Sequence, residues 1–487
     1  MGASTLGWRS DLSGLQPWHW RSQPLCQQTG SEVFAALFLS AGANPGEPGQ
    51  IATLLESPGT GSASPLSRYS ICAGPPRCID GQAQVWTPPL GQILPTLRSR
   101  LGRSLADTST AEPPADLPFQ GGWLGWLGYD LAWEIEQLPW LKPEGLPFPV
   151  AFWYEPAEFA VLDHQQQVLW LATTQAARLD ALQQRLEQAD PQAIAGEKLL
   201  ASPQKLQVGF TQADYEAAVR QAQNHIQAGD IFQANLSLRF STQVDQSPWQ
   251  IYAQLQKINP SPFASYWQTP WGSVVSCSPE RLVQLQGSQA QTRPIAGTRS
   301  RGASAAQDQA QADDLLSNEK EIAEHVMLVD LERNDLGRVC QWGSIKVDEL
   351  LSIERYSHVM HLVSNVRGQL RADQDAMTLI QALFPGGTIT GCPKIRCMEI
   401  IEQLEPVRRS LFYGSCGYLD WRGNLDLNIL IRTLLLAPQP SAAIAYQVWG
   451  QVGAGIVADS DPTREWLESL QKAKAQLLSL GASPHFN

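Results

Sequence analysis

Two pairs of glutamates, each with a spacing of three residues, are candidate metal ligands. Glu321 and Glu324 lie in the segment NEKEIAEHVMLVDLERNDLGR. Residues three apart share one face of a helix, so these carboxylates would lie side by side. Like charges at that distance repel each other, and a nearby cation would remove the repulsion. A single pair of this kind also fits a solvated acidic helix face.

The second pair, Glu465 and Glu468, lies in GAGIVADSDPTREWLESLQKA. Asp461 is a suitable N-cap and Pro462 suits the first helical position, so we predict a helix that begins here and carries both glutamates on one face. Lys472 follows one turn after Glu468 and can pair with it or with a substrate anion. Four carboxylates on two helices are suited to an oxygen-lined Mg²⁺ site, although their spacing alone also fits solvated helix faces.

Other residues are suited to an acidic organic substrate. Arg432 lies in the apolar run LNILIRTLLL, where we expect a buried strand and where a charge needs a carboxylate partner from substrate or protein. Gly453 and Gly455 can offer backbone N–H groups at close approach, as can the segment PGGTITGCPK. His361 could act on a substrate carbonyl or hydroxyl, or be a core residue. Glu280, in CSPERLV, is a candidate general acid, which at neutral pH requires burial to raise its pKa.

The elements that must position these residues fall into two predicted regions. In residues 1–200, short apolar runs such as Ile51–Leu55 and Phe152–Leu162 are separated by turn-forming clusters, which is typical of β-strands joined by loops. Thr174–Gln188 has helical periodicity. The unpatterned segment that follows, Asp190–Gln204, is the predicted boundary.

Helices and strands alternate in the second region, residues 205–480, which indicates an α/β or α+β domain. We predict helices at Ala213–Ala228 and near Pro248–Ile258, and strands after Asp230 and around Ser273–Gln286. The residues expected to face the core from the helix of the first glutamate pair are Ile322, Val326, Val329 and Leu336.

The composition is that of a folded protein. Of 487 residues, 43 % are hydrophobic and 17 % are charged, and the net charge of −12 argues against nucleic acid as a partner. The eight cysteines lack the spacing of a zinc site or a disulfide framework, so we expect reduced, mostly buried thiols in a cytoplasmic protein. No stretch reaches the length of a membrane span, and we expect no export signal or lipid anchor at the N-terminus.

Six segments resemble, in order and spacing, the signature of chorismate-utilising enzymes. This family includes anthranilate synthase component I, aminodeoxychorismate synthase component I, and isochorismate and salicylate synthases. The segments are CSPERLV, RPIAGTRSRG, KEIAEHVMLVDLERND, ERYSHVMHLVSNV, PGGTITGCPKIRCMEII and GAGIVADSDPTREW. The resemblance is strongest over Phe210–Lys474, and it implies a complex α/β sandwich of the anthranilate synthase component I type, with two facing β-sheets and helices outside.

The resemblance also implies roles for the candidate residues. Glu324 and Glu468 would bind Mg²⁺ directly, with Glu321 and Glu465 beside them. The metal would meet one carboxylate of chorismate, and Arg432 with the backbone of residues 453–455 would bind the other. The remaining residues near the substrate would be Glu280 as the acid that protonates the departing 4-hydroxyl, His361 at the ring, and Thr298, Thr388, Lys394, Phe412 and Lys472.

Gln233, in GDIFQANLSLRF, bears on the nucleophile. Members of the family that use water carry a Lys at this position as general base. A Gln cannot be a general base, so we expect the nucleophile to be ammonia. The chain contains no recognisable Cys-His-Glu set of a glutaminase, which implies a separate glutaminase (amidotransferase) subunit that supplies the ammonia.

The product is less narrowly defined by the sequence. QANLS, NPSPFASYW, GGWLGWLGYDLAWEIEQLP and GSCGYLDWRGNLDLNILIRT resemble aminodeoxychorismate synthase, which makes 4-amino-4-deoxychorismate for para-aminobenzoate and folate synthesis. Ala296, in PIAGT, resembles anthranilate synthase instead, because well-understood aminodeoxychorismate enzymes have a nucleophilic Lys there. Either ammonia adds without covalent help, a group such as Lys394 substitutes, or the product is anthranilate for tryptophan synthesis. The several segments favour aminodeoxychorismate.

The first region contains a pattern that resembles the tryptophan pocket of anthranilate synthase. The residues concerned are Leu55, Glu56, Ser57, Ser67 and Tyr69. We predict that tryptophan binds here, and plain strand packing is the alternative. Two less favoured functions remain: a tryptophan sensor without catalysis, and an isochorismate synthase, against which Gln233 argues.

Overall fold

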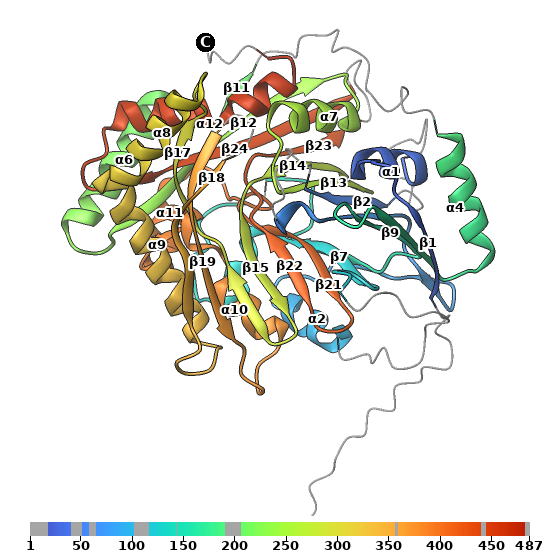
Figure 1. Cartoon of the computed structure of the whole chain (residues 1–487). Helices are drawn as coiled ribbons and strands as arrows, with labels where there is room; N and C mark the ends of the chain where they lie inside the picture. Colours follow the sequence, from blue (N-terminus) through green and yellow to red (C-terminus); the bar gives the residue numbers. More distant parts are fainter. Residues whose placement is uncertain are drawn as a thin grey trace, which may run out of the picture.

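Two large antiparallel sheets organise the chain (Figure 1). The computed structural model describes residues 18–39, 51–57, 65–101, 116–143, 145–189, 206–355, 359–439 and 445–482. The predicted boundary segment Asp190–Gln204 and the N-terminal segment for which we expected no signal lie outside these residues.

The larger sheet has 12 strands. In spatial order they are β1 (His19–Pro24), β10 (Val168–Thr173), β9 (Glu158–Asp163), β3 (Tyr69–Ala73), β2 (Ala52–Glu56), β13 (Phe263–Thr269), β14 (Gly272–Ser278), β23 (Thr433–Pro438), β24 (Tyr446–Ile456), β12 (Gln233–Val244) and β11 (Gln207–Val208), with β20 (Gly391–Cys392) paired to β12.

The smaller sheet has 10 strands. In spatial order they are β17 (Ile295–Ser300), β19 (Val359–Gln369), β16 (Gln289–Thr292), β15 (Arg281–Gln286), β22 (Leu425–Asn428), β21 (Ser415–Asp420), β7 (Gly122–Leu127), β8 (Ala151–Tyr154) and β6 (Val85–Trp86), with β18 (Lys346–Arg355) paired to β19. A separate ribbon pairs β4 (Cys78–Ile79) with β5 (Gln82–Ala83).

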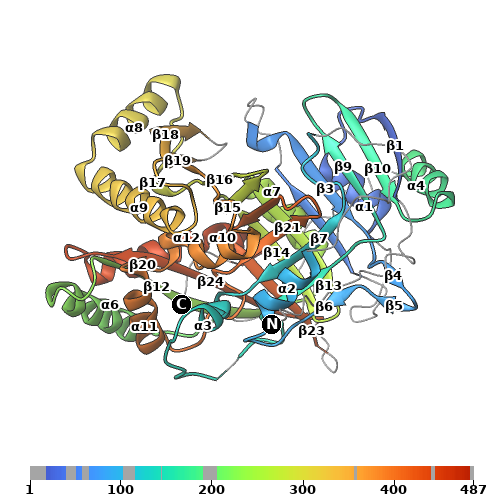
Figure 2. The ribbon, with the colours of Figure 1, turned by 90° about the horizontal axis from the view of Figure 1, so that it is seen from below.

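Helices cover the outer faces of the sheets. They are α1 (Gly30–Leu37), α2 (Ile93–Leu101), α3 (Ala132–Ile135), α4 (Ala177–Gln188), α6 (Gln212–Gln227), α7 (Pro248–Ile258), α8 (Ala305–Ser317), α9 (Glu319–Gly337), α10 (Ala376–Leu383), α11 (Lys394–Leu404) and α12 (Pro462–Ser479), with the short 3₁₀ turns η2 (Pro65–Ser67), η3 (Tyr129–Leu131) and η4 (Gly387–Ile389). Figure 2 shows α8 and α9 beside β17–β19 at one end of the molecule, and α1 and α4 beside β1, β9 and β10 at the other.

The two sheets pack directly against each other. Trp126 of the smaller sheet meets Trp267 of the larger one edge to face, with ring centroids 5.9 Å apart. The hydroxyl of Tyr154 donates a hydrogen bond of 2.9 Å to Thr53 across the same interface. Large aromatic side chains bury much apolar area, and their edge-to-face contacts add to that stabilisation. The predicted sandwich of facing sheets with outer helices is therefore confirmed.

Both sheets take strands from both sides of residue 200. The larger sheet places β2 beside β13, and the smaller one places β7 beside β21, so a block of early strands meets a block of later strands in each sheet (Figure 1). The predicted boundary consequently separates two patterns in the sequence but not two separate sheets. Antiparallel pairing allows this arrangement, because any two strands that run in opposite directions can pair whatever the distance between them in the chain.

Most of the predicted elements are confirmed. The helix predicted near Pro248–Ile258 is α7 with those same bounds, and α12 begins at Pro462 with Asp461 as its N-cap. The strand predicted after Asp230 is β12. One prediction on α9 is wrong: Val326 is 49 % exposed, whereas Val329 and Leu336 are buried as expected. The buried face of α9 also carries the polar residues His325, Glu332 and Asp335. A prediction from the spacing of apolar residues alone does not identify them.

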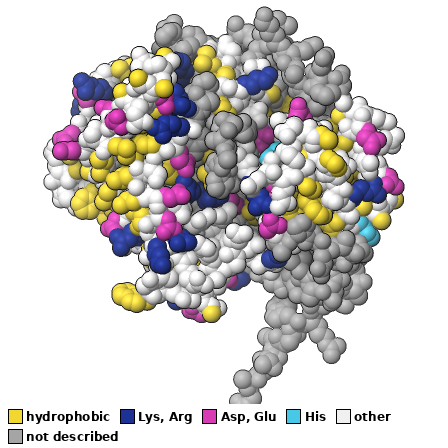
Figure 3. Space-filling model, in the orientation of Figure 1, with side chains coloured by type: hydrophobic (Ala, Val, Ile, Leu, Met, Phe, Trp, Pro, Cys, Tyr) yellow, Lys and Arg dark blue, Asp and Glu magenta, His cyan; other side chains and the backbone are white. Residues whose placement is uncertain are grey.

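Cysteines and surface charge agree with the composition. All the cysteines are free, and Cys72, Cys277, Cys340, Cys397 and Cys416 are buried. In Figure 3, basic and acidic side chains are intermingled on the visible face of the described residues. No helix in the described part of the chain is long and apolar enough to cross a membrane.

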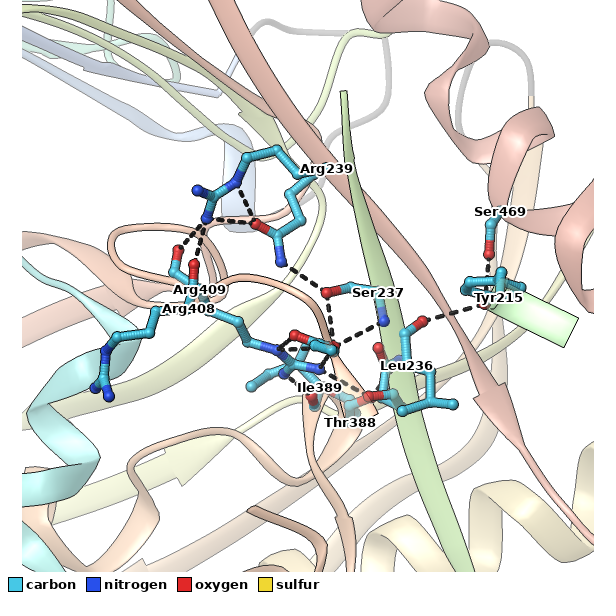
Figure 4. A network of polar contacts seen from close by, with 12 residues as sticks. Tyr215, Leu236, Ser237, Arg239, Thr388, Ile389, Arg408, Arg409 and Ser469 are labelled. Atoms are coloured by element: carbon cyan, nitrogen blue, oxygen red, sulfur yellow. Dashed lines mark hydrogen bonds and ion pairs between the residues drawn. The ribbon is translucent and has the colours of Figure 1, made fainter. Parts of the chain in front are cut away.

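A buried ionic network links α11, β12 and η4 (Figure 4). Arg409 donates to the carboxylate of Glu405 at 2.6 and 3.0 Å, to the carbonyl of Ile389 at 2.6 Å, and to the carbonyl of Asn235 at 2.7 Å. Glu405 in turn accepts the backbone N–H and the hydroxyl of Ser237, both at 2.8 Å. Because these groups are buried and fully hydrogen-bonded, the network fixes β12 relative to the loop that contains Ile389.

Removing one partner of this network should destabilise the protein strongly. We expect Glu405→Ala to lower the free energy of unfolding by about 3–5 kcal/mol, because it leaves the Arg409 guanidinium buried without its carboxylate. Glu399→Ala is the matched control on α11, since its carboxylate pairs with Arg396 and both side chains are about one third exposed. That change should cost less than about 1 kcal/mol in urea unfolding. Equal losses for the two variants would contradict the role given to Glu405.

Candidate active site

The first glutamate pair meets β12 and β24 at their ends. The amide nitrogen of Gln233 on β12 donates a hydrogen bond of 2.9 Å to Glu324 on α9. Gly455 of β24 lies opposite Asn235. A Cβ atom at Gly455 would lie 2.4 Å from the Gln233 amide nitrogen and 3.4 Å from a carboxylate oxygen of Glu324. The glycine therefore provides the space in which the Gln233 and Glu324 side chains meet. The sequence did not suggest this reason for a glycine at position 455.

Glu321 and Glu324 have different partners although they share one helix face. Glu321 accepts a hydrogen bond of 3.0 Å from Arg299 of β17. The pKa of Glu324 is raised, chiefly by burial, while the Gln233 hydrogen bond opposes that shift and the charge of Glu321 adds to it. Glu321 thus forms an ion pair, whereas the hydrogen bond that Glu324 accepts comes from a neutral amide.

The second pair, on α12, is also unequal. Glu468 is exposed and forms an ion pair of 2.8 Å with Lys472, whose ammonium also donates to the carbonyl of Gly453 at 3.1 Å. Glu465 is buried, and burial raises its pKa, with the charge of Glu468 adding to the shift. The predicted helix that carries Glu465 and Glu468 is confirmed. Lys472 pairs with Glu468, which is one of the two partners expected for it.

The two pairs share two lysine neighbours. Lys320 and Lys472 lie close enough to lower the pKa of both Glu324 and Glu465. Carboxylate oxygens are the ligands that Mg²⁺ prefers, and buried carboxylates with raised pKa values would be stabilised by such a cation, so these donors suit the metal in their chemistry. Among the described residues, however, no three His, Cys, Asp or Glu side chains are grouped closely enough to hold a metal ion. The four-carboxylate site therefore stays a prediction.

Glu280 lies in the connection from β14 to β15 and is buried between the sheet and η4. Burial raises the pKa of its carboxyl to about 8, and the charge of Glu332 adds to the rise. Thr388, the backbone of Ile295 and the charge of Arg432 oppose the shift. At pH 7 this carboxyl group is protonated, which is the state that a general acid needs.

His361 lies on β19 opposite Thr298 of β17. Its Nδ1 is 2.9 Å from the Thr298 hydroxyl. Burial lowers the pKa of His361 to about 3, and the positive charge of Arg432 lowers it further. The imidazole is therefore neutral at pH 7, so it can orient a substrate through hydrogen bonds but does not supply a positive charge.

Arg432 differs from the prediction. It is half-buried and precedes β23 instead of lying within a strand, and its φ of +49° turns the chain there. Its guanidinium donates a hydrogen bond of 2.8 Å to the side-chain oxygen of Asn259. The charge of the guanidinium lowers the pKa of both Glu280 and His361.

The side chains of Lys394 and Phe412 contact other groups of the protein. The Lys394 ammonium nitrogen donates to Asp335 at 2.6 Å and to the carbonyl of Leu383 at 2.9 Å. A nucleophilic amine needs a free lone pair, so these contacts disfavour Lys394 as the substitute nucleophile. Phe412 is 1 % exposed in the core, with the Arg239 guanidinium over its ring.

The predicted tryptophan pocket corresponds to a cavity of about 140 Å³ between the two sheets. Leu55, Glu56, Ser57 and Tyr69 line it, whereas Ser67 does not and its neighbour Leu66 does. The opposite wall comes from the smaller sheet. Its lining residues there include Arg281, Gln284, Tyr418, Asp426 and Asn428.

Glu56 holds three neighbouring side chains together at this cavity. Its carboxylate accepts hydrogen bonds from the Ser31 hydroxyl at 2.6 Å, the Tyr252 hydroxyl at 2.6 Å and the Gln256 amide at 2.7 Å. Arg281, whose guanidinium binds Asp426 at 2.8 Å through two nitrogens, lies over the ring of Phe263 in the same cavity. The cavity thus combines aromatic walls with buried charges.

Sequence reasoning missed several residues that shape the site. Glu332 and Asp335, with the same spacing as Glu321 and Glu324, are buried on α9, and the charge of Glu332 adds to the raised pKa of Glu280. Their spacing was a usable signal, but an acidic pair near a helix end is usually solvated. Asn259 and Arg299, the partners of Arg432 and Glu321, were given no role because the sequence does not show which distant side chains meet.

Comparison with known proteins shows which family the chain resembles. A protein family described as chorismate binding enzyme matches residues 51–478. The chain is similar to an anthranilate synthase component I-like protein of Synechocystis sp., at 58 % identity over 99 % of this chain and 95 % of the relative. It is also similar to aminodeoxychorismate synthase component 1 of Bacillus subtilis, at 45 % identity over 75 % of this chain and 78 % of the relative.

Two further likenesses bear on the reaction and the fold. Anthranilate synthase component 1 of Synechocystis sp. is 42 % identical over 75 % of this chain and 77 % of the relative. The crystal structure of anthranilate synthase component I from Streptococcus pneumoniae is 33 % identical, with a TM-score of 0.72, over 85 % of this chain and 93 % of that chain.

The raised pKa of Glu280 can be measured directly. Because burial raises this pKa to about 8, the carboxylic acid form should persist at pH 7 and be lost as the pH rises through about 8. We expect an infrared difference spectrum of wild type minus Glu280→Gln to show a carboxylic acid band at pH 7 that disappears above about pH 8. A band lost near the ordinary pKa of a glutamate, about 4.3, would contradict the burial argument.

Proposed function

Because the chain belongs to the family of chorismate binding enzymes, we propose that it aminates chorismate with ammonia in a Mg²⁺-dependent reaction. The observation that carries this proposal is the environment of Gln233. Its amide nitrogen donates to Glu324, so its amide oxygen points away from that carboxylate. This oxygen is buried and accepts no hydrogen bond within the described part of the chain. An amide oxygen can accept an N–H from ammonia but cannot take a proton from water as a base.

Glu280 supplies the proton for the leaving group in this proposal. The lone pair of ammonia forms the new C–N bond as the bond from ring carbon C4 to its hydroxyl oxygen breaks. The Glu280 O–H gives its proton to that oxygen, which leaves as water, and the added nitrogen loses a proton. Burial of Glu280, which keeps its carboxyl protonated at pH 7, supports this role.

The other residues hold the substrate. Chorismate carries two carboxylates, and Arg432 is the cation that lies beside Glu280 and His361. Neutral His361, oriented by Thr298, can donate or accept a hydrogen bond at the ring. Glu324 and Glu468 would hold Mg²⁺, with Glu321 and Glu465 beside them, and the ion would supply positive charge for the second carboxylate in an otherwise acidic space.

The ammonia must come from another protein. The chain carries no recognisable glutaminase triad, and relatives such as that of Bacillus subtilis are named as component 1. We therefore propose a glutaminase subunit as partner. Ammonium salts should replace it in vitro, because ammonia itself is the nucleophile.

We propose 4-amino-4-deoxychorismate as the product. Several segments of the sequence resemble aminodeoxychorismate synthases. Two relatives in Synechocystis sp. support this choice. One is named anthranilate synthase component 1, and the other is named an anthranilate synthase component I-like protein. The protein named anthranilate synthase component 1 matches less of this chain than the other one does. Ammonia would add without a covalent intermediate, since Ala296 has no nucleophile and Lys394 is bound to Asp335.

Anthranilate synthase is the second candidate. Ala296 favours it, and so do the relatives of that name and the solved structure from Streptococcus pneumoniae. In that reaction the same residues would aminate the ring at another carbon, and pyruvate would then be lost. We also propose that tryptophan binds in the cavity lined by Leu55, Ser57 and Tyr69, whose aromatic and charged walls suit an amphipathic indole ligand.

The reaction is tested by incubating the protein with chorismate, Mg²⁺ and an ammonium salt, and by identifying the product by chromatography. We expect 4-amino-4-deoxychorismate. Anthranilate with pyruvate would support the second candidate, and isochorismate would contradict the role of Gln233. Excess EDTA should abolish turnover, because the carboxylates alone would repel the chorismate dianion. Activity that persists in EDTA would show that the four-carboxylate assignment is wrong.

Tryptophan binding is measured separately by isothermal titration calorimetry on the purified protein. We expect saturable heat with one site per chain. Tyr69→Ala should weaken the binding at least about tenfold, because it removes an aromatic wall of the cavity. Exposed Trp342, at the turn before β18, gives a control, since Trp342→Ala should change nothing. The absence of binding heat in the wild type would remove the pocket from the proposal.

A further inference from the structure

Two buried amide oxygens on one face of β12 have no donor in the part of the chain that the structure describes. They belong to Gln233 and Asn235, which lie two residues apart and therefore point to the same side of the strand. Buried polar atoms almost always have a hydrogen-bond partner, and each exception calls for an explanation. The proposed function gives a role to the oxygen of Gln233 and leaves that of Asn235 unexplained.

The other polar groups of Asn235 are bound. Its backbone N–H donates to the carbonyl of Thr390 at 2.9 Å, and its backbone carbonyl accepts from Arg409 at 2.7 Å. Its amide nitrogen donates to the carbonyl of Thr388 at 3.4 Å. Because a backbone carbonyl can only accept, this contact defines which end of the amide is the nitrogen and turns the oxygen away from Thr388. Asn235 is therefore held in place with one acceptor that no described residue occupies.

Two glycines of β24 leave room beside the two amides. A Cβ atom at Gly453 would lie 2.9 Å from the side-chain oxygen of Asn235, and one at Gly455 would lie 2.4 Å from the amide nitrogen of Gln233. Gly453 and Gly455 are also two residues apart, so they lie on the same side of their strand. Glycine inside a strand often marks a place where a ligand approaches closely.

The next amide on this face shows a contrast. The side chain of Gln451 on β24 donates to the Ser237 hydroxyl at 2.7 Å, and its oxygen accepts two hydrogen bonds from Arg239, of 2.9 and 3.1 Å. The protein thus satisfies both ends of a buried amide farther along the strand. At the first residues of β12, by contrast, it supplies no donor from the described chain to the oxygens of Gln233 and Asn235.

Both groups are acceptors, which defines the chemistry of their ligand. A substrate carboxylate has no donor hydrogen and is unsuited to them. Chorismate has one hydroxyl, whereas ammonia carries three N–H bonds and ammonium carries four. An acceptor that binds an N–H of ammonia also leaves the nitrogen lone pair free to attack the ring, which a donor would not do. Two successive acceptors therefore suit ammonia or ammonium better than they suit chorismate.

We propose that Asn235 is a second residue that binds ammonia, and that its side-chain oxygen accepts an N–H from the nitrogen nucleophile at a position next to Gln233. The inference rests on the proposed function, in which ammonia aminates chorismate. Equivalent atoms two residues apart on a strand are separated by about 7 Å, so the two oxygens offer successive positions along β12. Loss of the second acceptor should weaken the binding of ammonia and leave the groups that bind chorismate unchanged.

Asn235→Leu tests the inference, because leucine keeps the size and branching of the side chain but has no acceptor. The rate is measured at saturating chorismate and Mg²⁺ while ammonium chloride is varied and sodium chloride keeps the ionic strength constant. A second series varies chorismate at saturating ammonium. We expect KM for ammonium to rise about tenfold through loss of a hydrogen bond to a buried ligand, with KM for chorismate and kcat within about twofold of wild type.

Two further variants accompany the test. Gln243→Leu is the matched control, because Gln243 lies on the same side of β12 at its other end, where its amide donates to Gln439 and Gln447. Its kinetic constants should equal those of the wild type. Asn235→Ala removes the same acceptor without added bulk and carries the test if Asn235→Leu does not fold. Water can enter the space that alanine leaves, so KM for ammonium should rise by a smaller factor, about threefold.

An unchanged KM for ammonium in the variant that folds overturns the inference. A rise in KM for chorismate that equals or exceeds the rise for ammonium also overturns it, because the Asn235 oxygen would then bind chorismate or support the fold of the site. Failure of the proposed function is distinct from these results. A wild-type product without nitrogen overturns amination and this inference together, whereas an aminated product with an unchanged KM for ammonium overturns this inference alone.

Discussion

The ion pair between Arg409 and Glu405 is the constraint on which the site depends. Arg409 binds the carbonyls of Ile389 and Asn235, and Glu405 binds Ser237, so one buried pair joins η4 to β12. The proposed ammonia-binding residue, Gln233, lies two residues before Asn235. Thr388, which opposes the raised pKa of the proposed acid, lies beside Ile389. A shift of this pair would separate the nucleophile from the acid, and because each partner is buried, neither can exchange its contacts for water without a large loss of stability.

Burial acts in opposite directions on the two groups nearest the proposed reaction. It raises the pKa of Glu280 to about 8 and lowers that of His361 to about 3. Both shifts have the same cause, since a medium of low polarity disfavours the charged form, which is the anion for one group and the cation for the other. The site therefore presents two neutral side chains beside the positive Arg432. This combination suits a dianionic substrate whose hydroxyl must be protonated as it leaves.

The acidic pairs of α9 and α12 show how equal spacing leads to unequal roles. Glu321 has Arg299 and Glu468 has Lys472 as partners. Glu324 accepts a hydrogen bond from the Gln233 amide, and the pKa values of Glu324 and Glu465 are raised by burial. On the same helix, Glu332 and Asp335 face the interior and meet Lys394. The spacing of three puts each pair on one helix face, but the element opposite that face decides what the carboxylates do.

The sequence by itself determined the local elements and the types of group available. Asp461 and Pro462 predicted the start of α12, the pattern after Asp230 predicted β12, and Gln233 excluded a basic side chain at its position, because these are properties of short segments. The tertiary structure alone decided that Val326 faces outward, that Arg432 precedes its strand, that strands from both sides of residue 200 share each sheet, and that Glu332 is buried. Those facts depend on contacts between residues far apart in the chain, and the burial that shifts the pKa values of Glu280 and His361 arises only when the sheets and helices pack together.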